Sequence, residues 1–95
     1  METDRAKQTV DVIIPARNEE DCLGRCLQSL MVQQGISFQI TVVDDGSTDR
    51  TRAIAESFPG VQVLSAGELR PGMTGKVNAL VTGVAGSTAE WLKLP

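Results

Sequence analysis

The sequence predicts an α/β fold: a parallel sheet built in the order βαβαβαβ, with helices on its faces. Short β-branched runs alternate with longer stretches whose apolar residues recur at helical spacing. Gly and Pro residues separate several of these segments. The chain has 95 residues, of which 41% are hydrophobic, so it is long enough for one domain and no more. We therefore expect residues 1–95 to form a single domain.

Four segments have the composition of strands. Residues 10–15 (VDVIIP) predict a buried strand that ends at a proline, and residues 38–43 (FQITVV) predict the second. Residues 61–64 predict the third strand. Residues 90–94 (EWLKL) resemble a fourth, although Lys93 interrupts its apolar run. Because helices connect these strands, the carboxyl ends of the strands are expected to meet at one edge of the sheet.

The first predicted helix follows Asn18, which is expected to cap it, and acidic residues 19–21 occupy its first turn, where they suit the helix dipole. Helical spacing predicts its apolar face: Leu23, Cys26, Leu27, Leu30 and Met31. Gly35 is expected to end it. Both cysteines, Cys22 and Cys26, are interpreted as small apolar residues on a helix face.

The second predicted helix follows a turn at residues 44–47 and runs to about Phe58, before Pro59-Gly60. One side of it carries Thr51, Ile54, Ala55 and Phe58. Residues 65–72 are predicted to be a loop, after which Thr74 caps a third helix that ends at Gly86-Ser87. Helical spacing predicts the apolar face of this third helix: Val77, Leu80, Val81 and Val84.

The composition excludes several classes of function. The net charge is −3 and no basic cluster occurs, which argues against nucleic-acid binding. No apolar run is long enough to span a membrane, and no signal peptide is visible, so we expect a cytoplasmic location. The chain has two cysteines and no histidine, which excludes a structural zinc site and a Ser-His-Asp or Cys-His catalytic pair.

Two polar clusters, residues 16–19 and residues 44–47, follow the first two predicted strands and are expected at the same edge of the sheet. Asp44 and Asp45 are adjacent carboxylates after an apolar strand. One interpretation is a turn with a helix cap, in which Gly46 takes a positive φ. The other is a carboxylate that accepts hydrogen bonds from a base or a ribose. Taken alone, the pair does not separate the two.

Lys76 lies in the first turn of the third predicted helix, where a cation opposes the helix dipole by roughly 0.3–1 kcal/mol. Either it is solvated and tolerates this cost, or it faces an anion, such as a diphosphate or Asp45, together with Gly72 and Gly75. Arg17 is likewise either solvated or able to stack on a base or pair with a phosphate. Each signal is weak by itself.

In combination the motifs become specific. The segments VIIPARNEE, VVDDGSTDRT and GKVNAL occur in this order, and over about residues 10 to 92 the chain resembles the family 2 inverting glycosyltransferases. The resemblance is closest to bacterial glycosyl transferases associated with hopanoid synthesis. It implies a three-layer, Rossmann-like sheet that forms the N-terminal half of a GT-A fold. It also implies binding of a nucleotide-diphosphate sugar, with a UDP-sugar favoured over a GDP-sugar.

The resemblance implies a role for each matching position. Pro15, Ala16, Arg17 and Glu19 are expected to line a nucleotide pocket at the end of the first strand. Asp45 is expected to contact the base, typically uracil, and Asp44 to support the turn or the ribose. Lys76 is expected to lie near the base and the diphosphate.

The chain departs from the family pattern at its end. Family members continue into a D-x-D motif that binds Mg²⁺ or Mn²⁺ on the donor diphosphate, and then to an Asp or Glu that acts as the base. No D-x-D motif follows Trp91, and Asp49 is the last aspartate. We therefore expect a truncated nucleotide-sugar-binding domain, without catalytic or metal-ligating residues of its own and inactive alone.

The expected truncation has further consequences. Apolar faces that would meet the missing half are expected to drive homo-oligomerisation, for example through the fourth strand or its edge. A full-length parent at the inner face of the membrane is left open. So is a non-catalytic α/β module that binds a nucleotide weakly or only self-associates. A Rossmann dinucleotide domain ranks last, because it needs G-x-G-x-x-G where this chain has residues 15–19 (PARNE).

Overall fold

The computed structural model describes residues 10–32, 38–87 and 91–93, and within them a four-stranded parallel sheet. The strands are β1 (Val10–Ala16), β2 (Phe38–Asp44), β3 (Val61–Ser65) and β4 (Trp91–Lys93). Their order in the sheet is β3-β2-β1-β4, and every neighbouring pair is parallel. The helices are α2 (Leu23–Met31), α3 (Thr51–Glu56) and α4 (Gly75–Ala85). The predicted α/β class and element order are confirmed.

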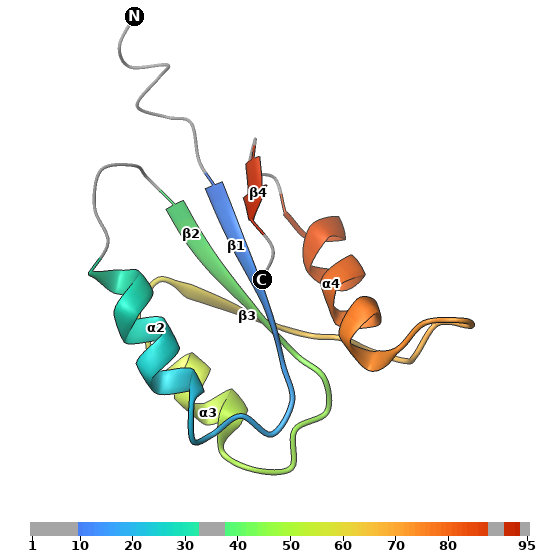
Figure 1. The fold of residues 1–95 in the computed structure, drawn as a ribbon, viewed down its shortest axis with the longest axis horizontal. Helices are drawn as coiled ribbons and strands as arrows, with labels where there is room; N and C mark the ends of the chain where they lie inside the picture. Colours follow the sequence, from blue (N-terminus) through green and yellow to red (C-terminus); the bar gives the residue numbers. More distant parts are fainter. Residues whose placement is uncertain (1–9, 33–37, 88–90, 94–95) are drawn as a thin grey trace, which may run out of the picture.

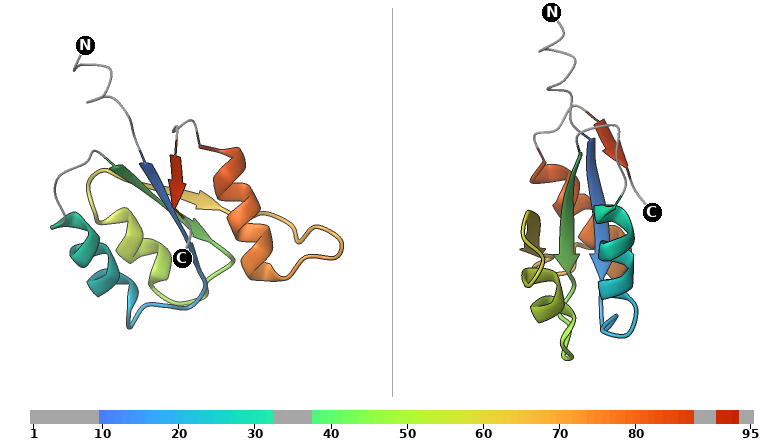
Figure 2. Two further views of the ribbon diagram at one scale, coloured as in Figure 1. Left: turned by 45° about the horizontal axis from the view of Figure 1, so that its top comes forward. Right: turned by 90° about the vertical axis from the view of Figure 1, so that its left-hand side faces the viewer.

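The helices lie on both faces of the sheet, with α2 and α3 on one face and α4 on the other (Figures 1 and 2). The alternation of side chains along each strand explains this arrangement, since successive residues point to opposite faces. Ile14 and Val42 point to the face covered by α2 and α3, whereas Ile13 and Val43 point to the face covered by α4. Both faces of β1 and β2 are therefore packed, as an apolar run predicts.

The first predicted helix begins later than expected. Asn18 does not cap it: α2 starts at Leu23, and Asn18 adopts a left-handed backbone with a φ of 53°. A turn precedes the helix, in which the Cys22 and Leu23 amides donate to the Glu19 carbonyl at 3.0 and 2.9 Å. The prediction failed because the Asn18 side chain bonds to a neighbouring loop instead. Gly35, the expected stop, lies outside the described residues.

The two cysteines are interpreted from the sequence as small apolar residues on a helix face; Cys26 lies on α2 and Cys22 directly precedes it, but both are exposed and neither belongs to the buried side of the helix. Leu23 and Leu27 form the buried line of α2, whereas Met31 is 42% exposed. Leu30 packs partly against the same core. The predicted side of the second helix is confirmed, because Thr51 and Ala55 are fully buried and two further residues, Ile54 and Phe58, pack partly against the core.

The third helix packs differently from the expectation. Thr74 caps α4 as predicted, with its hydroxyl accepting the Val77 amide at 3.2 Å. The buried residues, however, are Asn78, Ala79 and Gly83. The predicted apolar face is only partly confirmed, because Leu80 packs partly against the core, whereas Val77 is 45% and Val84 39% exposed. Small side chains occupy the inner face because they allow the axis of α4 to lie close to β1.

The last strand agrees with the predicted position, although its predicted ends, Glu90 and Leu94, lie outside the described residues. No helix within the described ranges is long and apolar enough to cross a membrane.

Candidate functional site

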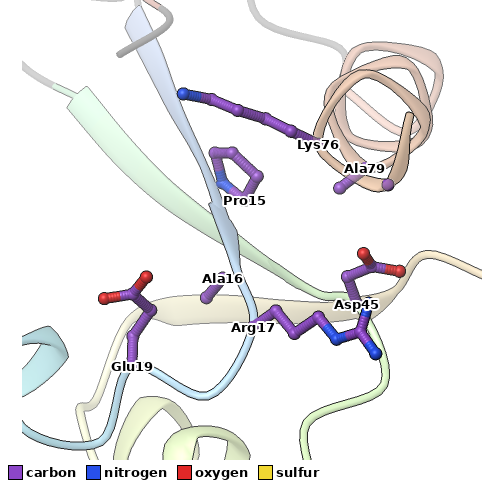
Figure 3. A pocket seen from close by; sticks show the side chains of 8 residues that line it. Pro15, Ala16, Arg17, Glu19, Asp45, Lys76 and Ala79 are labelled. Carbon is purple, nitrogen blue, oxygen red and sulfur yellow. The ribbon is translucent and has the colours of Figure 1, made fainter. Parts of the chain in front are cut away.

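A cavity of about 360 Å³ opens at the carboxyl ends of β1 and β2, beside the start of α4 (Figure 3). Eight residues line it: Pro15, Ala16, Arg17, Glu19, Asp45, Gly75, Lys76 and Ala79. Six of these are among the seven residues proposed from the sequence as nucleotide-binding. The seventh, Asp44, does not line the cavity. The two additions both belong to α4, whose inner face the apolar spacing did not predict.

The strands bring the two polar clusters to the same level. Ala16 and Asp44 are register partners at the ends of β1 and β2. One step further, the Asp45 amide donates to the Ala16 carbonyl at 2.9 Å, which extends the ladder into the cavity wall. Parallel strands that end together place the residues after them around one site.

Asp44 is buried and points away from the cavity, to the face covered by α3. Its Oδ1 accepts the Ser47 amide at 3.2 Å, which closes the turn, and its Oδ2 lies 3.7 Å from Arg52 Nη1. Gly46 within this turn has a φ of 71°, as the turn interpretation expects. This geometry agrees with a role for Asp44 in supporting the turn, whereas a contact of Asp44 with a ribose stays a prediction.

Asp45 lies on the opposite face of the sheet, against the first residue of α4. A Cβ at Gly75 would lie 2.5 Å from Asp45 Oδ2, so the absence of a side chain at Gly75 leaves room for the carboxylate. Asp45 is partly exposed at the cavity wall. The end of β2 and the start of α4 together determine the position of the Asp45 carboxylate. At this position it can accept hydrogen bonds from a ligand.

Lys76 is exposed in the first turn of α4, and its side chain runs past Pro15 and away from Asp45 (Figure 3). Within the described ranges, Lys76 and Asp45 form no ion pair. Arg17 and Glu19 come from the loop after β1, and both are exposed. The cavity thus has cationic and anionic side chains on its walls, and the amino end of α4, which favours anions, lies at its edge.

The loop after β1 is joined to the loop after β2 by hydrogen bonds between their residues. The Thr48 amide donates to Asn18 Oδ1 at 2.8 Å, and the Glu20 amide donates to Asp49 Oδ2 at 3.3 Å. Desolvation raises the pKa of Asp49, but hydrogen bonds from Thr51 and Glu20 outweigh it and hold this pKa below its ordinary value of 3.8. The carboxylate of Asp49 is therefore charged in the folded protein near neutral pH.

The carboxylates of the cavity do not form a metal centre. Among the described residues, no group of three or more His, Cys, Asp or Glu side chains is placed to hold a metal ion. Glu19 and Asp45, both on the cavity wall, do not supply the clustered oxygen ligands that Mg²⁺ or Mn²⁺ takes from protein. These residues therefore do not fit the divalent metal expected for full-length family members, and no chemical step is derived through one.

The motifs at this cavity match a known family. The model of glycosyl transferase family 2 covers residues 11–93, which is nearly the whole described region. The chain belongs to glycosyl transferase family 2. The match includes every residue that lines the cavity.

Curated relatives include a glycosyltransferase and an uncharacterized protein. The 4,4'-diaponeurosporenoate glycosyltransferase of Staphylococcus aureus is 36% identical over 77 residues, which are 81% of this chain and 20% of that protein. An uncharacterized protein of Mycobacterium tuberculosis is 43% identical over 61 residues, which are 62% of this chain and 19% of that protein. The chain thus spans about a fifth of the length of these relatives.

Solved structures of a glycosyltransferase have the same fold. Glucosyl-3-phosphoglycerate synthase of Mycobacterium tuberculosis, in complex with Mn²⁺, UDP and glucosyl-3-phosphoglycerate, superposes with a TM-score of 0.76 at 30% identity. The match covers 99% of this chain and 35% of that one. A complex of the same synthase with Mn²⁺, UDP-glucose and phosphoglyceric acid gives a TM-score of 0.70 at 28% identity, over 96% of this chain and 34% of that one. The Rossmann-like α/β sheet expected from the sequence is confirmed.

Proposed function

We propose that residues 10–93 bind the nucleotide part of a nucleotide-diphosphate sugar, UDP in preference to GDP. The corresponding whole protein would transfer the sugar to an acceptor with inversion. The observation that carries this proposal is the cavity at the strand ends, which gathers Arg17, Asp45 and Lys76 from three separate segments. Family membership and the UDP complexes of the similar synthase support it further.

The chemistry of the cavity suits a nucleoside diphosphate. The Asp45 carboxylate is a hydrogen-bond acceptor. The N–H group of a uracil base needs such an acceptor as its partner. Lys76 and Arg17 provide positive charge for the diphosphate, and the first-turn amides of α4 have no partners within the helix. In this proposal, Lys76 occupies an electrostatically unfavourable place in α4 because its positive charge is used on the ligand.

The test is a titration of the 95-residue chain with UDP, followed by NMR shifts of assigned backbone amides. We expect saturable shifts at residues 16–19, 45 and 75–79, and weaker ones with GDP. Asp45→Asn removes the charge but keeps the shape and one acceptor oxygen. It should weaken UDP binding about tenfold, since a hydrogen bond to a charged group contributes about 1.5–3 kcal/mol and a neutral one about 0.5–1.5 kcal/mol.

Asp21→Asn is the matched control, because Asp21 is an exposed aspartate that does not line the cavity. It should bind UDP as the unmodified chain does. Equal affinity of the Asp45→Asn and Asp21→Asn variants would remove Asp45 from the proposed site. Absence of any shift at millimolar UDP would contradict the proposed function itself.

We further propose that the chain binds the donor without transferring its sugar. Among the described residues, no group of three or more His, Cys, Asp or Glu side chains could hold the metal ion that such a transfer uses in the family. Incubation with UDP-glucose and Mn²⁺, followed by measurement of released UDP, is expected to give no more release than a sample without protein. Metal-dependent release by the purified chain would refute this part of the proposal.

The alternative function is self-association without nucleotide binding, and the outer face of α4 favours it. Five apolar residues line a hollow of about 330 Å³ on this face: Val77, Leu80, Val81, Val84 and Ala85. If the chain associates through this face, sedimentation should shift with concentration, and Val84→Glu should abolish the shift because it places a charge in the interface. Arg25→Glu, at an exposed position of α2, is the control that should leave association unchanged. A monomer at all concentrations would exclude this alternative.

A further inference from the structure

Two loops meet beside the cavity through a reciprocal pair of hydrogen bonds. The Asn18 backbone amide donates to Ser47 Oγ at 3.0 Å, and the side-chain oxygen Asn18 Oδ1 accepts the Thr48 backbone amide at 2.8 Å. Asn18 thus acts as donor and acceptor towards two consecutive residues of the neighbouring loop. We call this pair of bonds the Asn18 clasp.

A second set of bonds continues the contact towards α3. The Glu19 amide donates to Thr51 Oγ1 at 2.7 Å, and the Arg50 amide donates to Glu20 Oε1 at 3.0 Å. Asp49 accepts the Glu20 amide on one oxygen and the Thr51 amide on the other. Three consecutive residues after β1 are therefore held to the loop after β2.

The clasp lies between residues that line the cavity. Arg17 and Glu19 flank Asn18 directly, and both line the cavity, as does Asp45 at the start of the other loop. The left-handed backbone of Asn18 determines how the chain turns between Arg17 and Glu19. Asn tolerates this conformation better than most residues do, because its short polar side chain bonds locally. The clasp can therefore control the relative position of the two cavity walls.

We propose that Asn18 is a positioning residue for the nucleotide pocket, which it holds in its binding shape by joining the loops after β1 and β2. The inference rests on the proposed nucleotide binding. Asn18 is exposed, so its substitution should change overall stability little. An effect on binding that exceeds the effect on unfolding is the signature that separates positioning from a merely structural role.

Three variants separate the backbone from the side chain. Asn18→Gly keeps access to positive φ but removes the acceptor oxygen. Asn18→Asp keeps an acceptor oxygen at the same place, and Asn18→Ala loses both features. Ser57→Ala is the matched control, because it removes one side-chain hydrogen bond, to the Ile54 carbonyl at 2.6 Å, at the other end of α3.

We expect Asn18→Gly to accelerate hydrogen exchange of the Thr48 amide and to weaken UDP binding about three- to tenfold, while the urea midpoint of unfolding stays near that of Ser57→Ala. Asn18→Asp should restore UDP affinity to within about twofold, and Asn18→Ala should lose at least as much affinity as Asn18→Gly. Unchanged Thr48 exchange in Asn18→Gly would show that the clasp does not form. Faster exchange with unchanged UDP affinity would show that it forms but does not position the pocket.

Failure of nucleotide binding would be recognised separately, because the unmodified chain would then show no shifts with UDP. In that case the positioning role is judged from the free protein. A changed amide shift of Asp45 in Asn18→Gly, restored in Asn18→Asp, would support it, because Asp45 is not a sequence neighbour of Asn18. An unchanged Asp45 shift would overturn it.

Discussion

Gly83→Ala is expected to lower the free energy of unfolding by about 1–3 kcal/mol, the usual cost of forcing an extra methyl group into a packed core. A Cβ at Gly83 would overlap Ile13 Cγ2 of β1 and lie 3.1 Å from Val43 Cγ2 of β2. Ile13 and Val43 are fully buried, so neither can move aside freely. In an exposed helix the same change would stabilise the protein by about 1 kcal/mol, so the expected sign is reversed by packing alone.

Urea unfolding followed by circular dichroism measures this effect. Gly24→Ala in α2 is the matched control, because a Cβ there would meet only Ile54 Cγ2 at 3.8 Å, an ordinary contact. It should leave stability unchanged or raise it. If Gly83→Ala proved as stable as Gly24→Ala, the result would contradict the close packing of α4 on β1. Failure of Gly83→Ala to fold, with Gly24→Ala folded, would agree with the packing described.

The second large effect is expected at Asn78, a fully buried polar residue on the inner face of α4. Its side-chain amide donates to the Glu68 carbonyl at 3.2 Å, and its oxygen accepts Arg70 Nη1 at 2.6 Å and the Arg70 backbone amide at 3.2 Å. Asn78 thus ties the loop between β3 and α4 to the helix. Asn78→Ala should cost about 1–3 kcal/mol, because it removes the hydrogen bonds that this buried side chain makes to the loop.

The expected pattern goes beyond the loss of stability. In Asn78→Ala, amide exchange should rise first at residues 66–73, since these are released before the sheet opens. The Thr82 hydroxyl also bonds to this loop, because it lies 3.1 Å from the Ala66 carbonyl and accepts Arg70 Nη1 at 3.4 Å. Within α4 it also donates to the Asn78 carbonyl at 2.9 Å. Thr82→Val removes these hydroxyl contacts but leaves the Asn78 side chain in place, so it is a milder comparison. Exchange that rises uniformly along the chain would argue against a local role for Asn78.

The candidate site was predictable to a large extent. Parallel strands end at one edge whatever their tertiary details, so the clusters after β1 and β2 were expected to meet, and their residues line one cavity. Asp44 is the exception. Alternation along β2 places Asp44 and Asp45 on opposite faces, and only the positions of α3 and α4 determine which of the two carboxylates faces the cavity.

The order of strands and helices, the Thr74 cap and the edge at which the site lies could be predicted, because they depend on local sequence pattern and chain direction. The role of Asn18 and the inner face of α4 could not be predicted, because they depend on contacts between segments that are far apart in the chain. Asn18 does not cap α2 because it bonds instead to Ser47 and Thr48, which are distant in sequence. The inner face of α4 went to Gly83, Ala79 and Asn78, because close approach to the sheet requires small side chains and the loop requires hydrogen-bond partners. The helical spacing of apolar residues in the sequence indicates neither the need for small side chains nor the need for hydrogen-bond partners.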